Sequence, residues 1–197
     1  MPGGKRERLS VRDWTEAALR ALARGGVPAV AVEPLAKSLG ATKGSFYWHF
    51  ADRNALLQAT LELWEQRATD QVLAGIDQRR DGATRLRDLV ELALLSVQRD
   101  TDSGAGSIEL ALQSSASHPA VGPTLQRVTS RRITALTQLY SALGLTPARA
   151  RDHALLAYTA YLGHVQMAHA TPELLPQGRA FRTHVDRIVS VMVEVNS

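Results

Sequence analysis

The spacing of apolar residues is the feature that most restricts how this chain can fold. Apolar side chains recur every three or four positions over most of the sequence, and the two-residue alternation of strands is scarce. Breaks rich in glycine and proline divide this pattern, beginning with Gly25-Gly26-Val27-Pro28. The sequence therefore predicts an all-α protein of about nine helices.

The breaks also predict where each helix begins and ends. A first helix is expected over residues 10–24, followed by a short one that has Pro34 in its first turn and ends at Gly40. Thr42 can cap the next helix, and Asp52 can cap a longer one that runs to about Arg80. Five more helices are expected over residues 83–100, 106–116, 120–143, 147–170 and 178–195. The last is rich in β-branched residues, but its spacing of three and four favours a helix.

Composition excludes several classes of protein. The chain has 197 residues and no cysteine, so it has neither disulfides nor thiolate metal sites. Its N-terminus has basic residues without a following apolar run, and no apolar stretch is long enough to span a bilayer. We expect a cytoplasmic protein without a membrane segment.

The charge of the chain is unevenly distributed. Residues 1–55 contain nine basic and five acidic residues, which accounts for the whole formal net charge of +4. A positive end attracts polyanions, of which nucleic acid is the commonest in the cytosol. Lys5, Arg6 and Arg8 are either an arm that reaches DNA or an ordinary solvated tail.

The spacings within residues 32–50 are those of a helix-turn-helix. Ala36 lies four residues before Gly40, so a small residue allows two helices to cross closely and a glycine supplies the turn between them. Pairs of apolar residues four apart face inward from the two helices: Leu35 and Leu39, then Phe46 and Phe50. Such a unit presents its second helix to a major groove of DNA.

The stretch TKGSFYWHF, residues 42–50, carries the polar groups for this contact. It holds four of the ten aromatic residues of the chain, and two of them, Phe46 and Phe50, are assigned to the core. The remaining side chains supply hydroxyl, amine, phenol and imidazole groups next to a helix N-terminus, which suit phosphates and base edges. Gly44 lets the backbone approach DNA closely.

The segment AVEPLAKSLGATKGSFYWHFADRNALLQA resembles the DNA-binding region of the TetR family of bacterial transcriptional repressors, over about residues 10–60. The resemblance implies that a set of residues faces double-stranded DNA, with Lys43 and Ser45 toward base edges and Tyr47 and His49 on phosphates. The set comprises Thr42, Lys43, Gly44, Ser45, Tyr47, Trp48, His49 and Arg53. Trp48 has two readings, packing under the next helix or contact with the DNA backbone.

One position departs from the family pattern. The family often has serine or threonine at the start of the second helix, where this chain has Ala31. Glu33 follows two residues later and brings a carboxylate near the phosphates unless it points away. One expected phosphate contact is therefore weakened.

A single helix-turn-helix reads few base pairs, so a two-fold homodimer on a palindromic operator is expected. Residues 1–51 would form the DNA-binding domain and residues 52–197 a larger helical domain for effector binding and dimerisation. Two stripes in the last two helices are candidates for the dimer seam, or else face the core of their own subunit. They are Ala154, Tyr158, Tyr161, Val165, Phe181, Val185, Ile188 and Met192.

The middle helices are expected to surround a cavity for a small-molecule effector of unknown identity. Candidate lining residues are apolar with a few polar groups: Trp64, Leu94, Gln98, Glu109, Gln113, Tyr140, Tyr161 and His164. Among these, Glu109 has apolar neighbours on its helix. It would pair with a cationic ligand or with an arginine, such as Arg85 or Arg132.

The sequence lacks the motifs of an enzyme. None of the six histidines forms a pair four apart, and there is no GxSxG, P-loop or strand-linked GxGxxG motif. Neither a catalytic residue nor a metal or cofactor is expected. The favoured function is a repressor released from its operator by an effector. The alternatives are an effector-independent regulator, a non-specific helical DNA-packaging protein and, last, an all-helical enzyme.

Overall fold

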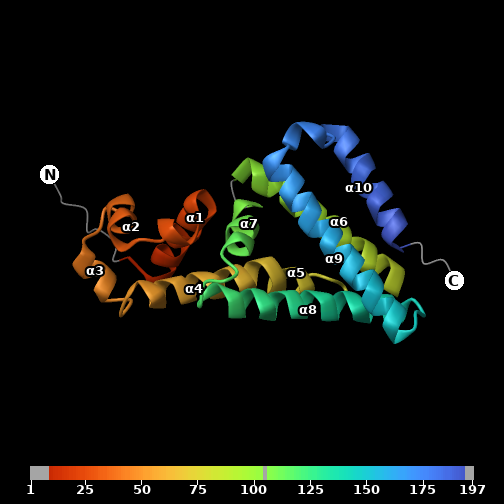
Figure 1. Cartoon of the computed structure of the whole chain (residues 1–197), viewed down its shortest axis with the longest axis horizontal. Coiled ribbons are helices and arrows are strands. Elements are labelled where there is room, and N and C mark those ends of the chain that lie inside the picture. The colour runs from red at the N-terminus through yellow and green to blue at the C-terminus, as the bar shows by residue number, and fades with distance from the viewer. Residues whose placement is uncertain (1–8, 104–105, 194–197) are drawn as a thin grey trace.

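The computed structural model describes residues 9–103 and 106–193, apart from the side chains of 99–107, and these residues form an elongated helical molecule (Figure 1). No strand occurs within these ranges. The basic residues Lys5, Arg6 and Arg8 lie outside the described residues. The fold is all-α, as the apolar spacing predicts.

Three helices form one end of the molecule: α1 (Val11–Ala29), α2 (Val32–Ser38) and α3 (Lys43–Tyr47). Ser10 caps α1 in a reciprocal capping box with Asp13. Regular helical geometry stops before Gly25 and Gly26, which have φ of −148° and +66°. The glycine pair therefore ends the first helix where the sequence predicts, and the chain turns toward α2.

A long, nearly continuous helix connects this end to the rest of the molecule (Figure 1). It consists of α4 (Arg53–Glu65), a wider π-helical turn (Gln66–Asp70) and α5 (Gln71–Ala74). Asp52 caps it, since its carboxylate accepts a hydrogen bond of 2.8 Å from the backbone N–H of Ala55. The helix stops before Gly75, so the predicted extension to Arg80 is wrong. The Asp77 carboxylate accepts from the Arg79 N–H and stabilises a turn in place of the last helical turns.

Five further helices complete the chain: α6 (Gly82–Ser103), α7 (Gly106–Ser114), α8 (Val121–Ala142), α9 (Pro147–Ala170) and α10 (Gly178–Val193). A short 3₁₀ turn, Pro172–Leu174, joins the last two. With α4 to α5 taken as one helix, the described residues contain the nine helices expected from the sequence. The β-branched segment is helical, as its spacing predicts.

The buried apolar residues form two main clusters. The first joins α1 to α4 with parts of α7 and α8, and includes Trp14, Phe46, Leu112 and Val121, each fully buried. The second lies among α6, α8, α9 and α10 around Leu86 and Tyr140. The N-terminal helices therefore share their core with α7 and α8; in Figure 1, α7 stands beside α1, and α8 begins next to α4.

None of the helices in the described ranges combines the length and the apolar character needed to cross a membrane.

Candidate nucleic-acid interface and internal cavity

The turn between α2 and α3 has the geometry of a helix-turn-helix. Gly40 adopts φ of +61°, a left-handed conformation that glycine accepts without strain. The Ala41 N–H donates a 2.8 Å hydrogen bond to the Ala36 carbonyl and closes the turn. Leu35 and Phe46 are buried between the helices, and the Phe46 ring meets Trp14 of α1 edge-on at 5.4 Å. Helix α3 is thereby fixed on the outside of α1 and α2.

The outer face of α3 carries most of the residues that the sequence assigns to DNA contact. Thr42 caps the helix by accepting a hydrogen bond from the Ser45 N–H. Lys43, Gly44 and Tyr47 are exposed beside it, and Ser45 and His49 are half-buried. The face therefore combines the donors of a helix N-terminus with a cation and a phenol.

Trp48 lies at the surface. Its side chain is 80% exposed, so it does not pack under α4. An exposed indole next to Tyr47, itself 60% exposed, is an unusual apolar surface for a monomer. Of the two readings of Trp48, the surface position favours contact with the DNA backbone.

Glu33 on α2 forms an ion pair with Lys43 on α3. The pair raises the pKa of Lys43, because the hydrogen bond to Glu33 and its charge favour the ammonium form. Both side chains are exposed, so the pair is weak and open to exchange. The carboxylate thus points toward the cation that the sequence assigns to base contact.

The guanidinium of Arg53 is directed inward, in contrast to the expected contact with DNA. Its Nε and Nη2 donate hydrogen bonds of 2.6 Å to the carbonyls of Val30 and Val27. These carbonyls lie at the end of α1, where the Val27 oxygen also accepts a 3.2 Å hydrogen bond from the Val30 N–H, and the arginine gives each of them a side-chain partner. Arg53 therefore holds the α1–α2 connection against the start of α4.

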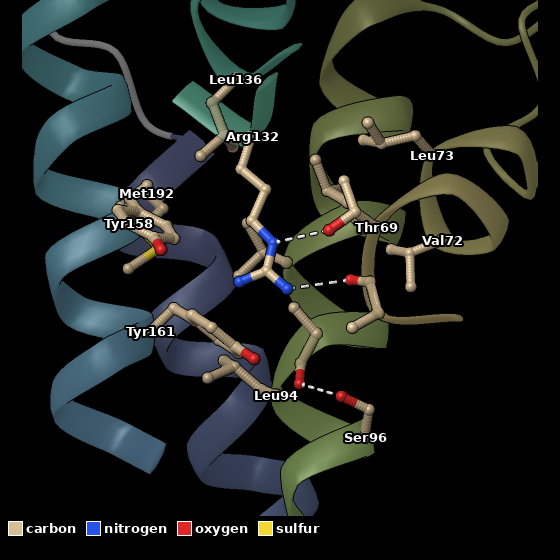
Figure 2. A pocket seen from close by; sticks show the side chains of 15 residues that line it. Thr69, Val72, Leu73, Leu94, Ser96, Arg132, Leu136, Tyr158, Tyr161 and Met192 are labelled. Atoms are coloured by element: carbon tan, nitrogen blue, oxygen red, sulfur yellow. Dashed lines mark hydrogen bonds between the residues drawn. The ribbon is translucent and has the colours of Figure 1, made fainter. Parts of the chain in front are cut away.

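A cavity of about 90 Å³ lies among the π-helical turn, α6, α8 and α9 (Figure 2). Its wall is mainly apolar, and Arg132 is the one charged side chain among the described residues that line it. Figure 2 shows the Arg132 side chain extending between Tyr158 and Tyr161 on one side and Thr69 and Val72 on the other.

Arg132 has a partner for each of its three nitrogens. Its Nη1 donates to Glu109 at 3.0 Å, its Nε to the Thr69 hydroxyl at 3.1 Å, and its Nη2 to the Ala68 carbonyl at 3.1 Å. The guanidinium carbon is also 5.6 Å from the Trp64 ring centre, within cation–π range. Burial by itself lowers the pKa of Arg132, but the nearby Glu109 carboxylate leaves that pKa above its ordinary value.

Known proteins that resemble this chain have the same helix-turn-helix architecture. The profile described as "Bacterial regulatory proteins, tetR family" matches residues 15–60, which cover α1 to the middle of α4. The helix-turn-helix is that of the TetR family. A search of curated protein sequences gives no match.

Solved structures of similar fold cover nearly the whole chain. A transcriptional regulator from Rhodococcus sp. Rha1 superimposes with a TM-score of 0.76 at 17% identity, over 94% of each chain. A putative transcriptional regulator from Saccharomonospora viridis in complex with choline gives 0.74 at 19% identity, over 94% of this chain and 96% of that one. The fatty acid degradation regulator FadR from Bacillus halodurans gives 0.69 at 15% identity, over 98% and 96%. The chain thus has the fold of these transcriptional regulators.

The cavity is lined by only two of the eight predicted pocket residues, Leu94 and Tyr161. Gln98, Tyr140 and Gln113 border separate surface hollows. Glu109 and Trp64 lie around Arg132 without reaching the cavity wall, and His164 packs against Phe181. Helix periodicity alone cannot separate a residue behind a wall from one that forms it.

Glu109 pairs with an arginine, one of the two alternatives left open by the sequence. The partner is Arg132, whereas Arg85 donates to the Gln78 side chain. Gln113, predicted to line the pocket, donates to the other Glu109 oxygen. Sequence reasoning did not assign Thr69, Ser96 or Arg132 to the cavity; the apolar neighbours of Arg132 on α8 were the available signal.

The two stripes assigned to a dimer seam mostly face the core of their own subunit. Ala154, Val165 and Val185 are at most 2% exposed, and Tyr158 and Phe181 are also buried. Tyr161, Ile188 and Met192 are half-buried and pack on the same core. The exposed apolar residues of α9 and α10 are different ones: Leu155, Leu156, Met167 and Val191. An inward stripe and an outward stripe share the same period, so spacing does not distinguish them.

Ion pairs connect the long helix to α1 and to α8. Arg67, in the π-helical turn, pairs with Glu16 of α1. At the end of α4, Glu65 accepts hydrogen bonds from Arg127 and Arg131 of α8, the closest at 2.6 Å. The pKa values of Glu16 and Glu65 are both lowered, chiefly by hydrogen bonds from their arginines. Among the described residues, no group of three histidine, aspartate or glutamate side chains is arranged to hold a metal ion.

Proposed function

We propose that this chain is a transcriptional repressor that binds a palindromic operator as a homodimer and is released by a small molecule. The observation that carries the proposal is the continuous helix from α4 to α5. Its N-terminal part packs on α1 in the helix-turn-helix core, and four residues of its C-terminal part line the cavity: Ala68, Thr69, Val72 and Leu73. An occupant of the cavity thus touches the helix that positions the DNA-binding face.

Two successive parts of the chain are proposed to have different functions. Residues 1–51 provide the DNA-binding domain and residues 52–197 the domain for effector binding and dimerisation. The residues proposed to meet DNA are Thr42, Lys43, Gly44, Ser45, Tyr47, Trp48 and His49. Arg53 is proposed to support this face by holding the α1–α2 connection against the start of α4. We place the protein in the cytoplasm, because a repressor must reach chromosomal DNA.

The homodimer is proposed to form through the outward faces of α9 and α10. Leu156 and Val191 are 63% and 75% exposed, and they border an apolar groove of about 440 Å³ between the two helices. Two helices from each subunit would form a four-helix bundle across the two-fold axis. Successive major grooves on one side of DNA are about 34–36 Å apart, so the two DNA-binding domains must be separated by this distance. An effector would change this distance.

Effector release is supported by the presence of the cavity and by the bound choline of the Saccharomonospora viridis regulator. A ligand that fits the cavity better at one distance between the two DNA-binding domains shifts the population of dimers toward that distance. A regulator without an effector is the second candidate, and it requires only the DNA-binding and dimer surfaces.

The test is selection of the purified protein against a random DNA library at near-physiological salt. Enrichment of a palindrome with two half-sites supports a dimeric regulator and yields its operator. Strong binding that depends on salt but enriches no motif indicates a DNA-packaging protein instead. Compounds that then release the palindrome identify an effector, and expression from a reporter promoter containing the palindrome separates repression from activation.

A further inference from the structure

The cavity wall is chemically uneven. Leucine, valine and alanine side chains form most of it, and Arg132 brings hydrogen-bond donors to one place. At that place Arg132 donates to two neutral oxygens that belong to residues of the cavity wall, the Thr69 hydroxyl and the Ala68 carbonyl (Figure 2). The donors that border the cavity are thus held by weak, uncharged acceptors.

The counter-charge of Arg132 lies elsewhere. Glu109 binds Nη1, is 5% exposed as a residue and does not line the cavity. Its second oxygen accepts a hydrogen bond from Gln113. Arg132 and Glu109 therefore bring no net charge to the cavity, although its edge still offers N–H donors.

From this arrangement we infer that the cavity takes an electrically neutral, mainly aliphatic molecule whose single hydrogen-bond acceptor, a ketone, ester or ether oxygen, binds the Arg132 guanidinium. The inference rests on the proposed effector-responsive function and names the class of effector. The acceptor takes the place of Thr69 or Ala68, so one neutral oxygen replaces another and the charge of the site does not change.

Charged ligands are excluded by the same geometry. A carboxylate would be a second negative charge beside one arginine that Glu109 already neutralises, and it would lose its hydration on entering an apolar space. A cationic ligand would meet the guanidinium itself. Arg132 also lies 5.6 Å and 5.8 Å from the ring centres of Trp64 and Tyr161, so it already uses the aromatic faces that would attract a cation.

Size gives a further limit. A dry apolar cavity of roughly 150 Å³ holds benzene. The present cavity, at about 90 Å³, takes a molecule of that size after small movements of flexible wall residues such as Met192. The ligand therefore has few atoms, or it widens the cavity as it enters.

The site also connects the ligand to the DNA-binding end. Ala68 and Thr69 both belong to the π-helical turn, so the turn loses one of its two bonds to Arg132 whichever of them the ligand acceptor replaces. The same turn carries Arg67, which pairs with Glu16 of α1. A neutral acceptor thus loosens the part of the long helix that is attached to the helix-turn-helix.

The test uses three probes with equal numbers of non-hydrogen atoms: pentan-2-one, butanoate and pentylammonium. Their dissociation constants for the full chain are measured by ligand-detected NMR titration at pH 7, without DNA. We expect pentan-2-one to bind at least about tenfold more tightly than either ion, because the ions lose hydration without gaining a counter-charge. Equal or tighter binding of butanoate, or no binding of pentan-2-one, overturns the inference.

The variant Glu109→Gln gives the sharpest contrast. It keeps the shape and an acceptor for Arg132 but leaves the guanidinium without a counter-charge, so butanoate should become the preferred probe by about tenfold. Glu65→Gln is the matched control, since it neutralises a carboxylate that pairs with Arg127 and Arg131 outside the cavity, and it should leave the ranking unchanged. An unchanged ranking in folded Glu109→Gln overturns the inference, and the wild-type ranking alone decides if that variant does not fold.

These outcomes are independent of operator binding. A chain that ranks the probes as expected but selects no palindrome retains the ligand site and loses the proposed function. A chain that selects a palindrome but prefers butanoate retains the function and loses the proposed ligand class.

Discussion

Arg67, in the π-helical turn that borders the cavity, forms an ion pair with Glu16 on the first helix of the DNA-binding region. The two residues are far apart in the sequence, and their side chains are about one-third and one-quarter exposed. The pair links the π-helical turn, whose Ala68 and Thr69 line the cavity, to α1, which packs against the helix-turn-helix. Its strength can be measured through the titration of Glu16.

We expect Glu16→Gln to lower the free energy of unfolding at pH 7 by at most about 1 kcal/mol, because the pair is partly exposed to water. The hydrogen bond from Arg67 lowers the pKa of Glu16 below its ordinary 4.5 in the folded chain. The stabilisation is therefore present above about pH 4.5 and is lost as the pH falls through the folded pKa. Denaturant titrations at several pH values would show a weaker acid dependence for Glu16→Gln than for a control change at exposed Glu91.

Phe46 and Trp48 are expected to respond in opposite ways to truncation. Phe46→Ala removes a fully buried ring and should lower the free energy of unfolding by roughly 3–5 kcal/mol. Trp48→Ala alters a side chain that is 80% exposed, so stability should change by no more than about 0.5 kcal/mol. Operator affinity should nevertheless fall by about 1 kcal/mol if the indole N–H binds a phosphate. Unchanged affinity in fluorescence anisotropy would remove Trp48 from the interface.

Lys43 and Glu33 give a test based on salt dependence. Lys43→Ala should weaken operator binding and reduce the slope of log K against log salt by about 1, since one phosphate contact is lost. Glu33→Ala should strengthen binding, because it frees Lys43 and removes a carboxylate near the phosphates. Arg79→Ala, at the turn after α5, is the control that leaves the slope unchanged. Weaker binding by Glu33→Ala would mean that the ion pair positions Lys43 for DNA.

The dimer surface is tested by charge. Leu156→Glu with Val191→Glu places carboxylates on the exposed faces of α9 and α10, so sedimentation should show a monomer at concentrations where the native chain is a dimer. Leu174→Glu alters an equally exposed leucine on the 3₁₀ turn and should leave the dimer intact. A persistent dimer in the double variant would place the interface on another surface.

His164 makes the fold sensitive to mild acid. Burial, and then the nearby His184, lower the pKa of its imidazole below the ordinary 6.5, so the folded chain resists protonation that the unfolded chain accepts. Stability is thus full above about pH 6.5 and declines as the pH falls below it. The decline in melting temperature between pH 8 and 5 should be smaller for His164→Phe than for a control change at exposed His169. Parallel curves for all three proteins would show that His164 does not titrate.

Local signals predicted most of the secondary structure. Gly25-Gly26, Gly40, Thr42 and Asp52 end or cap helices as expected, because these effects depend on the residue and its immediate neighbours. The π-helical turn was not predicted, since its residues Gln66 to Asp70 fit an α-helix equally well. The end of the long helix was misplaced because the turn at Asp77 is stabilised by side-chain hydrogen bonds that leave the apolar period unchanged.

The sites were predicted less evenly. The exposed face of α3 follows from the period of a short helix whose inward pair is fixed by Phe46. Arg53 is assigned to DNA by the family resemblance, yet its guanidinium donates to the carbonyls of Val30 and Val27 at the end of α1. The cavity wall depends on how α6, α8 and α9 cross, and these crossings are tertiary properties that spacing within one helix does not contain.

The shared core of the N-terminal helices has a practical consequence for building chimeric sensors. The predicted domain boundary at residue 51 suggests a point at which a different DNA-binding domain could be joined to residues 52–197. The buried cluster, however, continues from Trp14 and Phe46 into Ile108 and Leu112 of α7 and Val121 of α8. A DNA-binding domain from another protein that ends at residue 51 would leave the side chains of α7 and α8 packed against residues that do not match them in shape. A working hybrid must therefore exchange the inner faces of α7 and α8 together with the DNA-binding domain.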